Sequence, residues 1–433
     1  MPARTAALKA LGAIRTNDAW SDALLGEYIK KYGLNQKDAG LCTTLFYGVV
    51  QNQALLDHYI NSFLQGRKKL QPVLRDILRL AVYQILFLDR VPDSAAVNEA
   101  VKQAKRQFSP REAGLCNGVL RNLQRQKDSL ETPKDYSIRY SHPAPLVDLM
   151  KASVGKRLGA ILEADNSSPE TSVVTNTLKC IPAELEAVLR ASGVAVTPHP
   201  WLKGGFLLKG TGNLEQLPAF REGLFQVQDA AARLSIDVLD LKPGMKVLDL
   251  CAAPGGKSMA AAMHMKNQGS ILSCDVHGGK LPQIEMAAER LGVTLVSTQE
   301  NDASQYRPQW EGQFDAVIAD VPCSGLGVIR KKPDIRYKNI KDMEALPPLQ
   351  QAILQNAGRY VRPGGDLLYS TCTILKRENE EVVKAFLAEN RNFSTVELRL
   401  PEGLREQETG MLTLYQGLDH CDGFFLCHMR KSV

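Results

Sequence analysis

The 433-residue sequence lacks the patterns typical of disulfide-linked and zinc-binding proteins. Its nine cysteines include no Cys-x-x-Cys pair, and none of its seven histidines belongs to a His-Glu-x-x-His pattern. These absences argue against a disulfide framework and a structural zinc site, so no metal is expected, and they suit a reducing compartment. We expect most of the cysteines to be small buried side chains, and any cysteine with a chemical role to stand out by its local context.

The sequence also lacks a long apolar segment. No run approaches the length of a membrane-spanning helix, and residues 1–4 do not begin a signal peptide. We therefore expect a cytoplasmic protein. The length of the chain allows two or three domains with separate cores.

Positive charge is concentrated in the first third of the chain. Residues 1–130 hold 19 Lys and Arg against 11 Asp and Glu, whereas the remaining residues hold 34 against 36. A single basic cluster, such as Arg67, Lys68 and Lys69, is more often a solvated helical surface than a binding site. An excess that extends over a whole domain instead favours contact with the phosphate groups of a nucleic acid.

Apolar periodicity predicts a multidomain protein with three parts. Residues 1–140 show helical spacing throughout and predict an all-α bundle. Residues 141–224 alternate short strands with helices, which is compatible with a small α/β domain of the ferredoxin-like type. Residues 225–433 alternate near-continuous apolar strands with helices, which predicts a parallel, doubly wound Rossmann-like sheet.

Turn residues and apolar runs place the elements within these parts. The breaks expected between helices fall at Gly33, Gly66, Pro92 and Pro110. The runs expected as parallel strands are residues 247–251, 270–274, 294–297, 314–319 and 366–370. Two later runs, residues 411–415 and 423–429, predict an antiparallel hairpin at the edge of the sheet.

The most informative stretch lies between residues 246 and 258. An apolar strand runs into a glycine-containing turn that opens a helix, and doubly wound sheets bind ligands beyond the carboxyl ends of their strands. A Walker A sequence would need glycine where Cys251 stands, and Gly-x-Gly-x-x-Gly is absent. The turn therefore predicts a nucleoside site without a phosphate cradle. Its expected residues are Cys251, Ala252, Ala253, Pro254, Gly255, Gly256 and Lys257.

Three aspartates follow successive strands and extend this expected site. Asp275 ends the second strand, where a carboxylate can accept hydrogen bonds from both ribose hydroxyls. Asp302 follows the third strand, where it could meet an adenine amino group, and Asp320 ends the fourth. One such aspartate is as often a helix cap or turn residue as a ligand, but three in succession favour binding. An acidic pocket also suits a sulfonium cation.

Two cysteines occupy neighbouring strand ends. Cys323 follows the fourth strand, and Cys372 ends the fifth. Adjacent strand ends of a doubly wound sheet converge on one cleft, so both thiols should face the same ligand. A single cysteine at a strand end is more often structural. Two of them, one flanked by Asp320 and Pro322, favour catalysis.

A cysteine pair suits methylation at carbon 5 of cytosine. C5 is a poor nucleophile until a thiolate adds to C6, and cysteine is an effective attacking group near neutral pH. A carboxyl group that holds N3 and the exocyclic amine would favour this addition, a role for Asp320. After methyl transfer the C5 proton must leave, which requires a second group. The sequence spacing alone does not say which of Cys323 and Cys372 attacks.

The chain resembles the RNA cytosine-5 methyltransferases of the Sun or Fmu type. The stretches that carry the resemblance are residues 225–229, 251–257, 320–325, 330–334 and 371–372. The resemblance implies that Cys372 is the nucleophile, that Cys323 assists release, and that the methyl donor is S-adenosylmethionine. It adds Arg330 and Lys331 to the candidate RNA contacts, beside the basic cluster of residues 67–69.

The helical domain resembles the NusB-type RNA-binding fold. Together with the methyltransferase stretches, it is similar to bacterial enzymes that act on small-subunit (16S) ribosomal RNA, so this RNA is the expected partner. Three alternatives stay open: a cytosine-5 methyltransferase of another RNA such as tRNA, a non-catalytic RNA-binding assembly factor, and a methyltransferase of protein or small molecules. The intact set Cys372, Cys323 and Asp320 argues against a non-catalytic factor. The basic helical domain argues against a methyltransferase of protein or small molecules. The modified cytosine and the oligomeric state stay open, with a monomer favoured.

Overall fold

The computed structural model describes residues 2–16, 21–64, 66 and 70–433, and the chain divides into two compact units. The first unit contains Met1–Leu149 and Ile329–Lys338, and the second contains Met150–Val328 and Asn339–Val433. Within the described part of the chain, no helix is long and apolar enough to cross a membrane. The expected domain boundaries after residues 140 and 224 stay a prediction.

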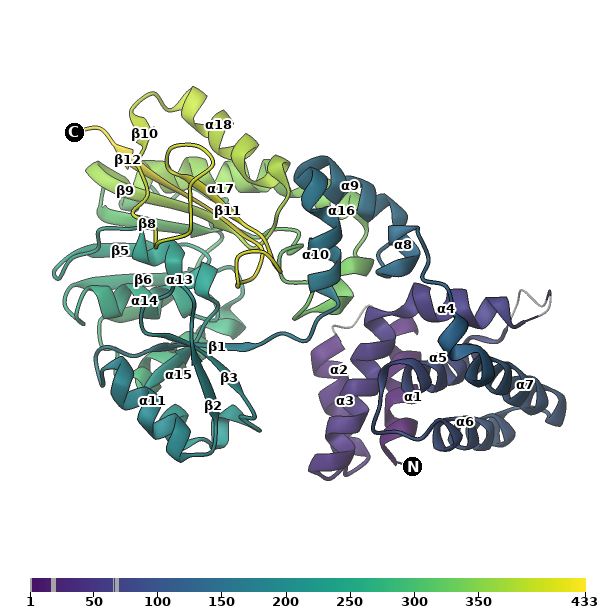
Figure 1. Cartoon of the computed structure of the whole chain (residues 1–433). Coiled ribbons are helices and arrows are strands. Elements are labelled where there is room, and N and C mark those ends of the chain that lie inside the picture. The colour runs from purple at the N-terminus through teal and green to yellow at the C-terminus, as the bar shows by residue number, and fades with distance from the viewer. Residues whose placement is uncertain (1, 17–20, 65, 67–69) are drawn as a thin grey trace. The chain divides into compact units, whose positions relative to one another are not determined.

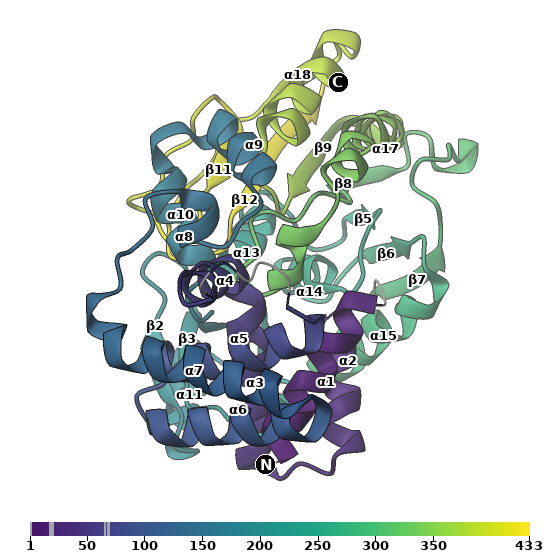
Figure 2. The same ribbon diagram turned by 90° about the vertical axis from the view of Figure 1, so that its right-hand side faces the viewer.

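The first unit is helical, as its periodicity predicts (Figure 1). Its helices are α1 (Pro2–Thr16), α2 (Ser21–Lys31), α3 (Gln36–Gln51), α4 (Gln53–Ser62), α5 (Pro72–Phe87), α6 (Asp93–Gln107), α7 (Pro110–Gln126), η1 (Lys127–Ser129), α8 (Tyr136–Arg139), the start of α9 (Ala144–Val154) and η6 (Pro333–Tyr337). Helices α6 and α7 lie side by side (Figure 2). The core of the unit includes the buried side chains of Phe46, Ile77 and Leu120.

Capping residues explain where two of these helices begin. Asn35 accepts a hydrogen bond from the backbone N–H of Asp38 at 2.9 Å and starts α3. Ser109 and Glu112 form a reciprocal capping box at the start of α7. Both starts coincide with predicted breaks. Asn52, between α3 and α4, marks a break that the periodicity did not predict.

The second unit begins with a small antiparallel sheet of order β2-β3-β1-β4. The elements up to its last strand are the end of α9, η2 (Gly155–Arg157), α10 (Leu158–Asp165), β1 (Thr171–Thr175), α11 (Pro182–Ala191), β2 (Ala195–Pro198), β3 (Gly205–Lys209), η3 (Leu214–Gln216), α12 (Pro218–Arg221) and β4 (Phe225–Val227). The order strand, helix, two strands, helix and strand is that of the ferredoxin-like fold expected here.

The larger sheet has the strand order β10-β12-β9-β8-β5-β6-β7, with β11 paired to β12. Its strands are β5 (Lys246–Asp249), β6 (Ser270–Asp275), β7 (Val296–Glu300), β8 (Phe314–Asp320), β9 (Val361–Thr371), β10 (Phe393–Thr395), β11 (Met411–Leu414) and β12 (Phe424–Lys431). Strands β5 to β9 are parallel. The chain moves outward from β5 to β7 and returns to β8 on the other side of β5, so a topological switch point lies between β5 and β8.

Helices cover both faces of this sheet, as the predicted doubly wound arrangement requires (Figure 1). Val247 and Ile318 belong to one core, while the adjacent residues Leu248 and Val317 belong to another. Helices α13 (Ala230–Asp237), α14 (Gly256–His264) and α15 (Leu281–Leu291) pack in the first core, and α17 (Leu346–Tyr360) and α18 (Glu380–Glu389) pack in the second. The remaining helical segments are η4 (Gly278–Lys280), η5 (Pro308–Trp310), α16 (Ile340–Glu344) and η7 (Lys376–Glu378).

The C-terminal hairpin forms, but its second strand is not at the edge. Strand β12 lies between β9 on one side and β10 and β11 on the other. All residues from Phe424 to Met429 are buried. A strand that is covered on both faces reads as a continuous apolar run, so its sequence does not distinguish an inner place from an edge.

Residues 329–338 lie in the chain between β8 and α16 but pack in the helical unit. Arg336 is fully buried there. Its Nη1 donates to the carbonyl oxygens of Gln51 at 2.8 Å, Tyr140 at 3.3 Å and Ser141 at 3.4 Å. A guanidinium is tolerated in an interior when its N–H groups are hydrogen-bonded, so these bonds fix the segment to the helices.

We predict that Arg336→Ala lowers the unfolding free energy of the helical unit by about 3 kcal/mol, because three carbonyl groups, two of them buried, lose a donor. Urea unfolding followed by circular dichroism measures the change. Lys332→Ala, at an exposed position of the same segment, is the control. A loss below about 0.5 kcal/mol, the size typical of a surface substitution, would contradict the prediction.

Candidate active site

The turn after β5 contains the residues predicted to bind a nucleoside. Gly255 precedes α14 with φ of +103°, and a Cβ atom there would lie 3.2 Å from Ile284 Cγ2. Both the backbone conformation and the close approach therefore favour glycine. Of the predicted turn residues, Ala252, Gly255 and Lys257 are buried, Cys251, Ala253 and Gly256 are half-buried, and Pro254 is exposed.

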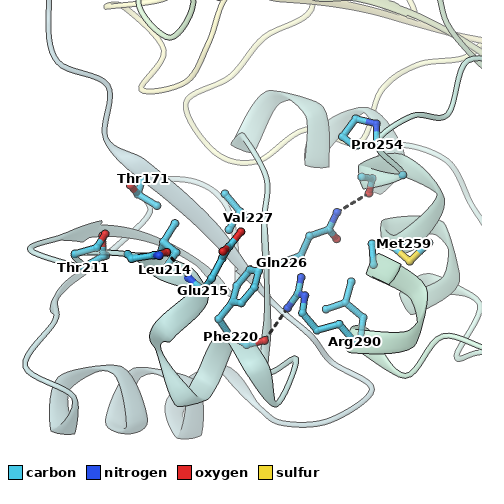
Figure 3. A pocket seen from close by; sticks show the side chains of 16 residues that line it. Thr171, Thr211, Leu214, Glu215, Phe220, Gln226, Val227, Pro254, Met259 and Arg290 are labelled. Carbon is cyan, nitrogen blue, oxygen red and sulfur yellow. Dashed lines mark hydrogen bonds between the residues drawn. The ribbon is translucent and has the colours of Figure 1, made fainter. Parts of the chain in front are cut away.

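Two glutamines from the smaller sheet support this turn. The side-chain amide of Gln226, in β4, donates to the carbonyl oxygen of Gly256 at 2.8 Å (Figure 3). Gln228 donates to the same oxygen at 3.1 Å, and both glutamine side chains are buried. The stretch 225–229 contributed to the family resemblance but received no role of its own. The contacts show that it fixes the first residue of α14.

A cavity of about 550 Å³ lies on this side of the turn (Figure 3). Its lining includes Pro254, Met259, Phe220 and Arg290. Arg290 donates to the carbonyl oxygens of Phe220 and Phe225, each at 3.0 Å, and its guanidinium lies over the Phe220 ring. None of the described residues that line the cavity is an aspartate or a cysteine, so it is separate from the cysteine pair.

Two of the predicted aspartates are held by backbone N–H groups. Asp275, at the end of β6 and only 8% exposed, accepts hydrogen bonds from the N–H of Ala253 at 3.3 Å and of His277 at 3.0 Å. Asp302, after β7, is exposed and accepts bonds from the hydroxyl and N–H of Ser304, which lower the pKa of Asp302. This set of carboxylates beside a glycine turn fits a nucleoside with no phosphate group.

Asp320 joins three elements of the site. Its Oδ2 accepts a hydrogen bond from the Lys257 ammonium at 2.7 Å, and its Oδ1 accepts one from the Ser370 hydroxyl at 2.7 Å. Lys257 is buried and lies over the ring of Phe424, 5.1 Å from its centre. The predicted turn and the two cysteine-bearing strand ends are therefore connected through one carboxylate. The sequence had placed Lys257 in the turn without identifying this partner.

The structure brings the two predicted cysteines together. The sulfur atoms of Cys323 and Cys372 are 3.3 Å apart, and both residues are half-buried. The hydrogen bond from Cys323 lowers the pKa of Cys372, and the nearby Lys257 ammonium lowers it further, against the opposing effect of burial. The same hydrogen bond, together with burial, raises the pKa of Cys323 well above its usual range. The contact between the two thiols therefore favours Cys372 as the more acidic of the pair.

The structure describes two of the five residues predicted to contact RNA. Arg330 and Lys331 are half-buried and pack in the first unit. Arg67, Lys68 and Lys69 lie outside the described residues. The role of all five as RNA contacts stays a prediction.

The fold and the cysteine pair define a methyltransferase that carries a helical domain and a ferredoxin-like domain. Profiles of three families match the chain: "16S rRNA methyltransferase RsmB/F" at residues 236–430, "NusB family" at 1–125, and "Methyltr_RsmF/B-like, ferredoxin-like domain" at 142–215. These matches confirm the three predicted fold types.

The chain belongs to the family of ribosomal RNA small subunit methyltransferase B. It is 38% identical to the probable enzyme of that name from Bacillus subtilis, over 99% of this chain and 98% of the relative. The Vibrio cholerae enzyme is 35% identical, over 92% of this chain and 91% of the relative. Among solved structures, the protein PH0851 matches 99% of this chain and 98% of its own, with a TM-score of 0.81 and 28% identity. A methyltransferase homolog from Pyrococcus horikoshii matches 69% of this chain and 98% of its own, with a TM-score of 0.61 and 28% identity.

Asp249 is a buried carboxyl group next to the turn that received no role from the sequence. It ends β5, is 0% exposed, and accepts a hydrogen bond from the Ser258 hydroxyl at 2.7 Å. Burial raises the pKa of Asp249 from 3.8 to about 7. The folded protein therefore binds a proton at Asp249 in the pH range where the unfolded chain has released it.

We predict that this carboxyl group destabilises the second unit as the pH rises from about 4 to about 7, because the folded state then holds more protons than the unfolded state. Asp249→Asn removes the titration and keeps an acceptor for Ser258. The variant should gain at least about 1 kcal/mol relative to the wild type between pH 5 and pH 8. Urea unfolding at both pH values measures this, and an equal difference at the two pH values would disprove it.

Proposed function

We propose that this protein methylates carbon 5 of a cytosine in small-subunit (16S) ribosomal RNA, with S-adenosylmethionine as methyl donor and a covalent bond between Cys372 and C6 as intermediate. The observation that carries the proposal is the pair of sulfur atoms 3.3 Å apart in the loops that follow β8 and β9. The relatives named as methyltransferases of small-subunit ribosomal RNA support the choice of substrate.

S-adenosylmethionine would supply an electrophilic methyl group. The turn Cys251–Lys257 would let the backbone approach this molecule, and the carboxylate of Asp275 would accept hydrogen bonds from the ribose hydroxyls. Asp302 would meet the adenine amino group. The fixed carboxylate of Asp275 and the absence of a phosphate-binding glycine pattern in the turn support this assignment.

We predict that Asp275→Ala weakens binding of S-adenosylmethionine about 10-fold or more, since the ribose would lose a charge-assisted bidentate contact. Calorimetric titration measures the affinity. Asp240→Ala is the control, because Asp240 is an exposed aspartate of the same unit. Unchanged affinity in Asp275→Ala would remove this residue from the ribose site.

The reaction proposed for the cysteines begins with the Cys372 thiolate. Its sulfur forms a bond to C6, and the π electrons of the C5=C6 bond shift toward N3, which would take up a proton through the carboxyl group of Asp320. This addition makes C5 electron-rich, so C5 would form a bond to the methyl group while N3 returns its proton to Asp320 and the C4=N3 bond is restored. Cys323, once its own proton has passed to water, accepts the proton of C5. The electrons of that C–H bond restore C5=C6, and the S–C6 bond breaks to return the Cys372 thiolate.

We predict that alanine substitutions of the two cysteines have opposite effects on the covalent adduct. Cys372→Ala removes the nucleophile, so neither adduct nor product should form while cofactor binding survives. Cys323→Ala should allow attack and methyl transfer but slow the loss of the C5 proton, so enzyme accumulates on methylated RNA. Denaturing gels with 16S ribosomal RNA, with and without S-adenosylmethionine, detect the adduct as a shifted band. The target base must be unstacked or in a single-stranded loop for this attack.

Other outcomes of this experiment would assign different roles to the cysteines or a different substrate to the protein. An adduct that forms with Cys372→Ala and not with Cys323→Ala means that the roles are exchanged. Methyl transfer to tRNA but not to 16S ribosomal RNA would identify another RNA substrate, and transfer to no RNA would favour the non-catalytic factor. Bisulfite sequencing of ribosomal RNA from cells with and without the protein would locate the cytosine.

A further inference from the structure

Two consecutive buried residues, Glu378 and Asn379, hold the loops that carry the cysteine pair. Glu378 ends η7, and Asn379 directly precedes α18. Both are 0% exposed. Neither residue received a role from the sequence.

Glu378 fixes the main chain on one side of Cys323, and Gln350 fixes it on the other. One carboxylate oxygen of Glu378 accepts hydrogen bonds from the N–H of Ser324 at 2.8 Å and from the side-chain amide of Gln350 at 3.0 Å. The same amide nitrogen of Gln350 donates to the carbonyl oxygen of Pro322 at 2.9 Å. Both neighbours of Cys323 are therefore bound to one buried pair of side chains.

Asn379 binds the two residues that flank Cys372. Its side-chain oxygen accepts a hydrogen bond from the Thr371 hydroxyl at 2.6 Å, and its side-chain nitrogen donates to the carbonyl oxygen of Thr373 at 3.0 Å. Asparagine at the start of a helix usually caps it with its side chain, yet Asn379 makes no such bond to α18. Its side-chain amide instead makes the two hydrogen bonds to Thr371 and Thr373, the residues on either side of Cys372. The hydroxyls of Ser324 and Thr373, 2.7 Å apart, connect the two loops directly.

We propose that Glu378 and Asn379 are positioning residues that set the separation of the Cys323 and Cys372 sulfur atoms for the two steps of the reaction, an inference that rests on the proposed function. Because the residues are adjacent in the chain, the two loops are fixed to one point of the fold. Glu378 offsets the desolvation cost of its buried carboxyl group by accepting the hydrogen bonds of Ser324 and Gln350, so its position is linked to that of the Cys323 loop. A displacement of about 1 Å at reacting groups can slow a reaction about 100-fold.

The first test measures the thiols in the protein alone, without RNA or cofactor. The rate at which iodoacetamide alkylates Cys372 is followed against pH by peptide mass spectrometry. The charged and titratable groups that act on this thiol are Cys323, Lys257, Asp320 and Asp422. Glu378→Ala and Asn379→Ala should each slow alkylation near pH 7 by about 5-fold or more, because Cys323 no longer donates its hydrogen bond well and less Cys372 is thiolate.

Conservative variants separate positioning from folding. Glu378→Gln keeps an oxygen for both donors and should stay within about 2-fold of the wild type. Thr371→Val removes one bond to Asn379 at constant size and should shift the alkylation profile in the same direction as Asn379→Ala. Asn390→Ala is the matched control, because Asn390 is a half-buried asparagine at the other end of α18. It should lower the melting temperature and leave the profile unchanged.

The second test uses the full reaction with 16S ribosomal RNA. Asn379→Ala should slow formation of the cofactor-dependent adduct about 10-fold or more, whereas Glu378→Ala should raise the fraction of enzyme trapped as adduct, as expected for Cys323→Ala. Lower melting temperatures with unchanged alkylation profiles and an unchanged ratio of adduct to turnover would overturn the inference. If the profiles shift while the wild type methylates no RNA, the thiol positioning stands and the proposed function fails.

Discussion

The parallel pairing of β8 with β9 is the constraint on which the candidate site depends. Asp320 and Ser370 are register partners in these strands, and the N–H of Val321 continues the pairing with a bond to the Ser370 carbonyl at 3.1 Å. Parallel strands end at one edge of the sheet, so two loops about fifty residues apart in sequence leave it side by side. The turn after β5 ends at the same edge. This is why Lys257 reaches Asp320.

Burial and charge make the cysteines of this chain differ in reactivity. Burial raises the pKa of Cys42 to about 11 and that of Cys116 and Cys274 to about 12, which leaves them as inert thiols. Burial and the surrounding carboxylates raise the pKa of Cys251 as well, although it lies in the turn. Cys372 differs because it has a thiol donor and an ammonium group within reach. The shared hydrogen bond, rather than exposure, therefore distinguishes Cys372 from the other thiols.

The sequence predicted the parts of the fold that depend on local patterns. Apolar runs followed by glycine located the turn after β5, and strand ends located Asp275, Asp320 and both cysteines, because periodicity and turn chemistry act over a few residues. The residues that support the site were not predicted. Arg336 contacts the Gln51 carbonyl, 285 residues away in sequence, and such pairings leave no periodic signal. The order of the two cysteines rests on the family resemblance and stays a prediction, since either sulfur can donate their shared hydrogen bond.

The path of the chain after Cys323 connects the helical unit to the candidate site. Residues 329–338 belong by packing to the helices, while Val328 and Asn339 belong to the second unit. The chain therefore enters the helical unit six residues after Cys323 and leaves it again through η6. A fragment without residues 1–149 would expose Arg336 and remove the carbonyl groups that it binds. Loss of activity in such a fragment would not by itself mean loss of RNA binding, because residues 329–338 would also lose the helices against which they pack. Substitutions in the intact chain separate these two effects, since they change the residues predicted to contact RNA while Arg336 keeps its partners.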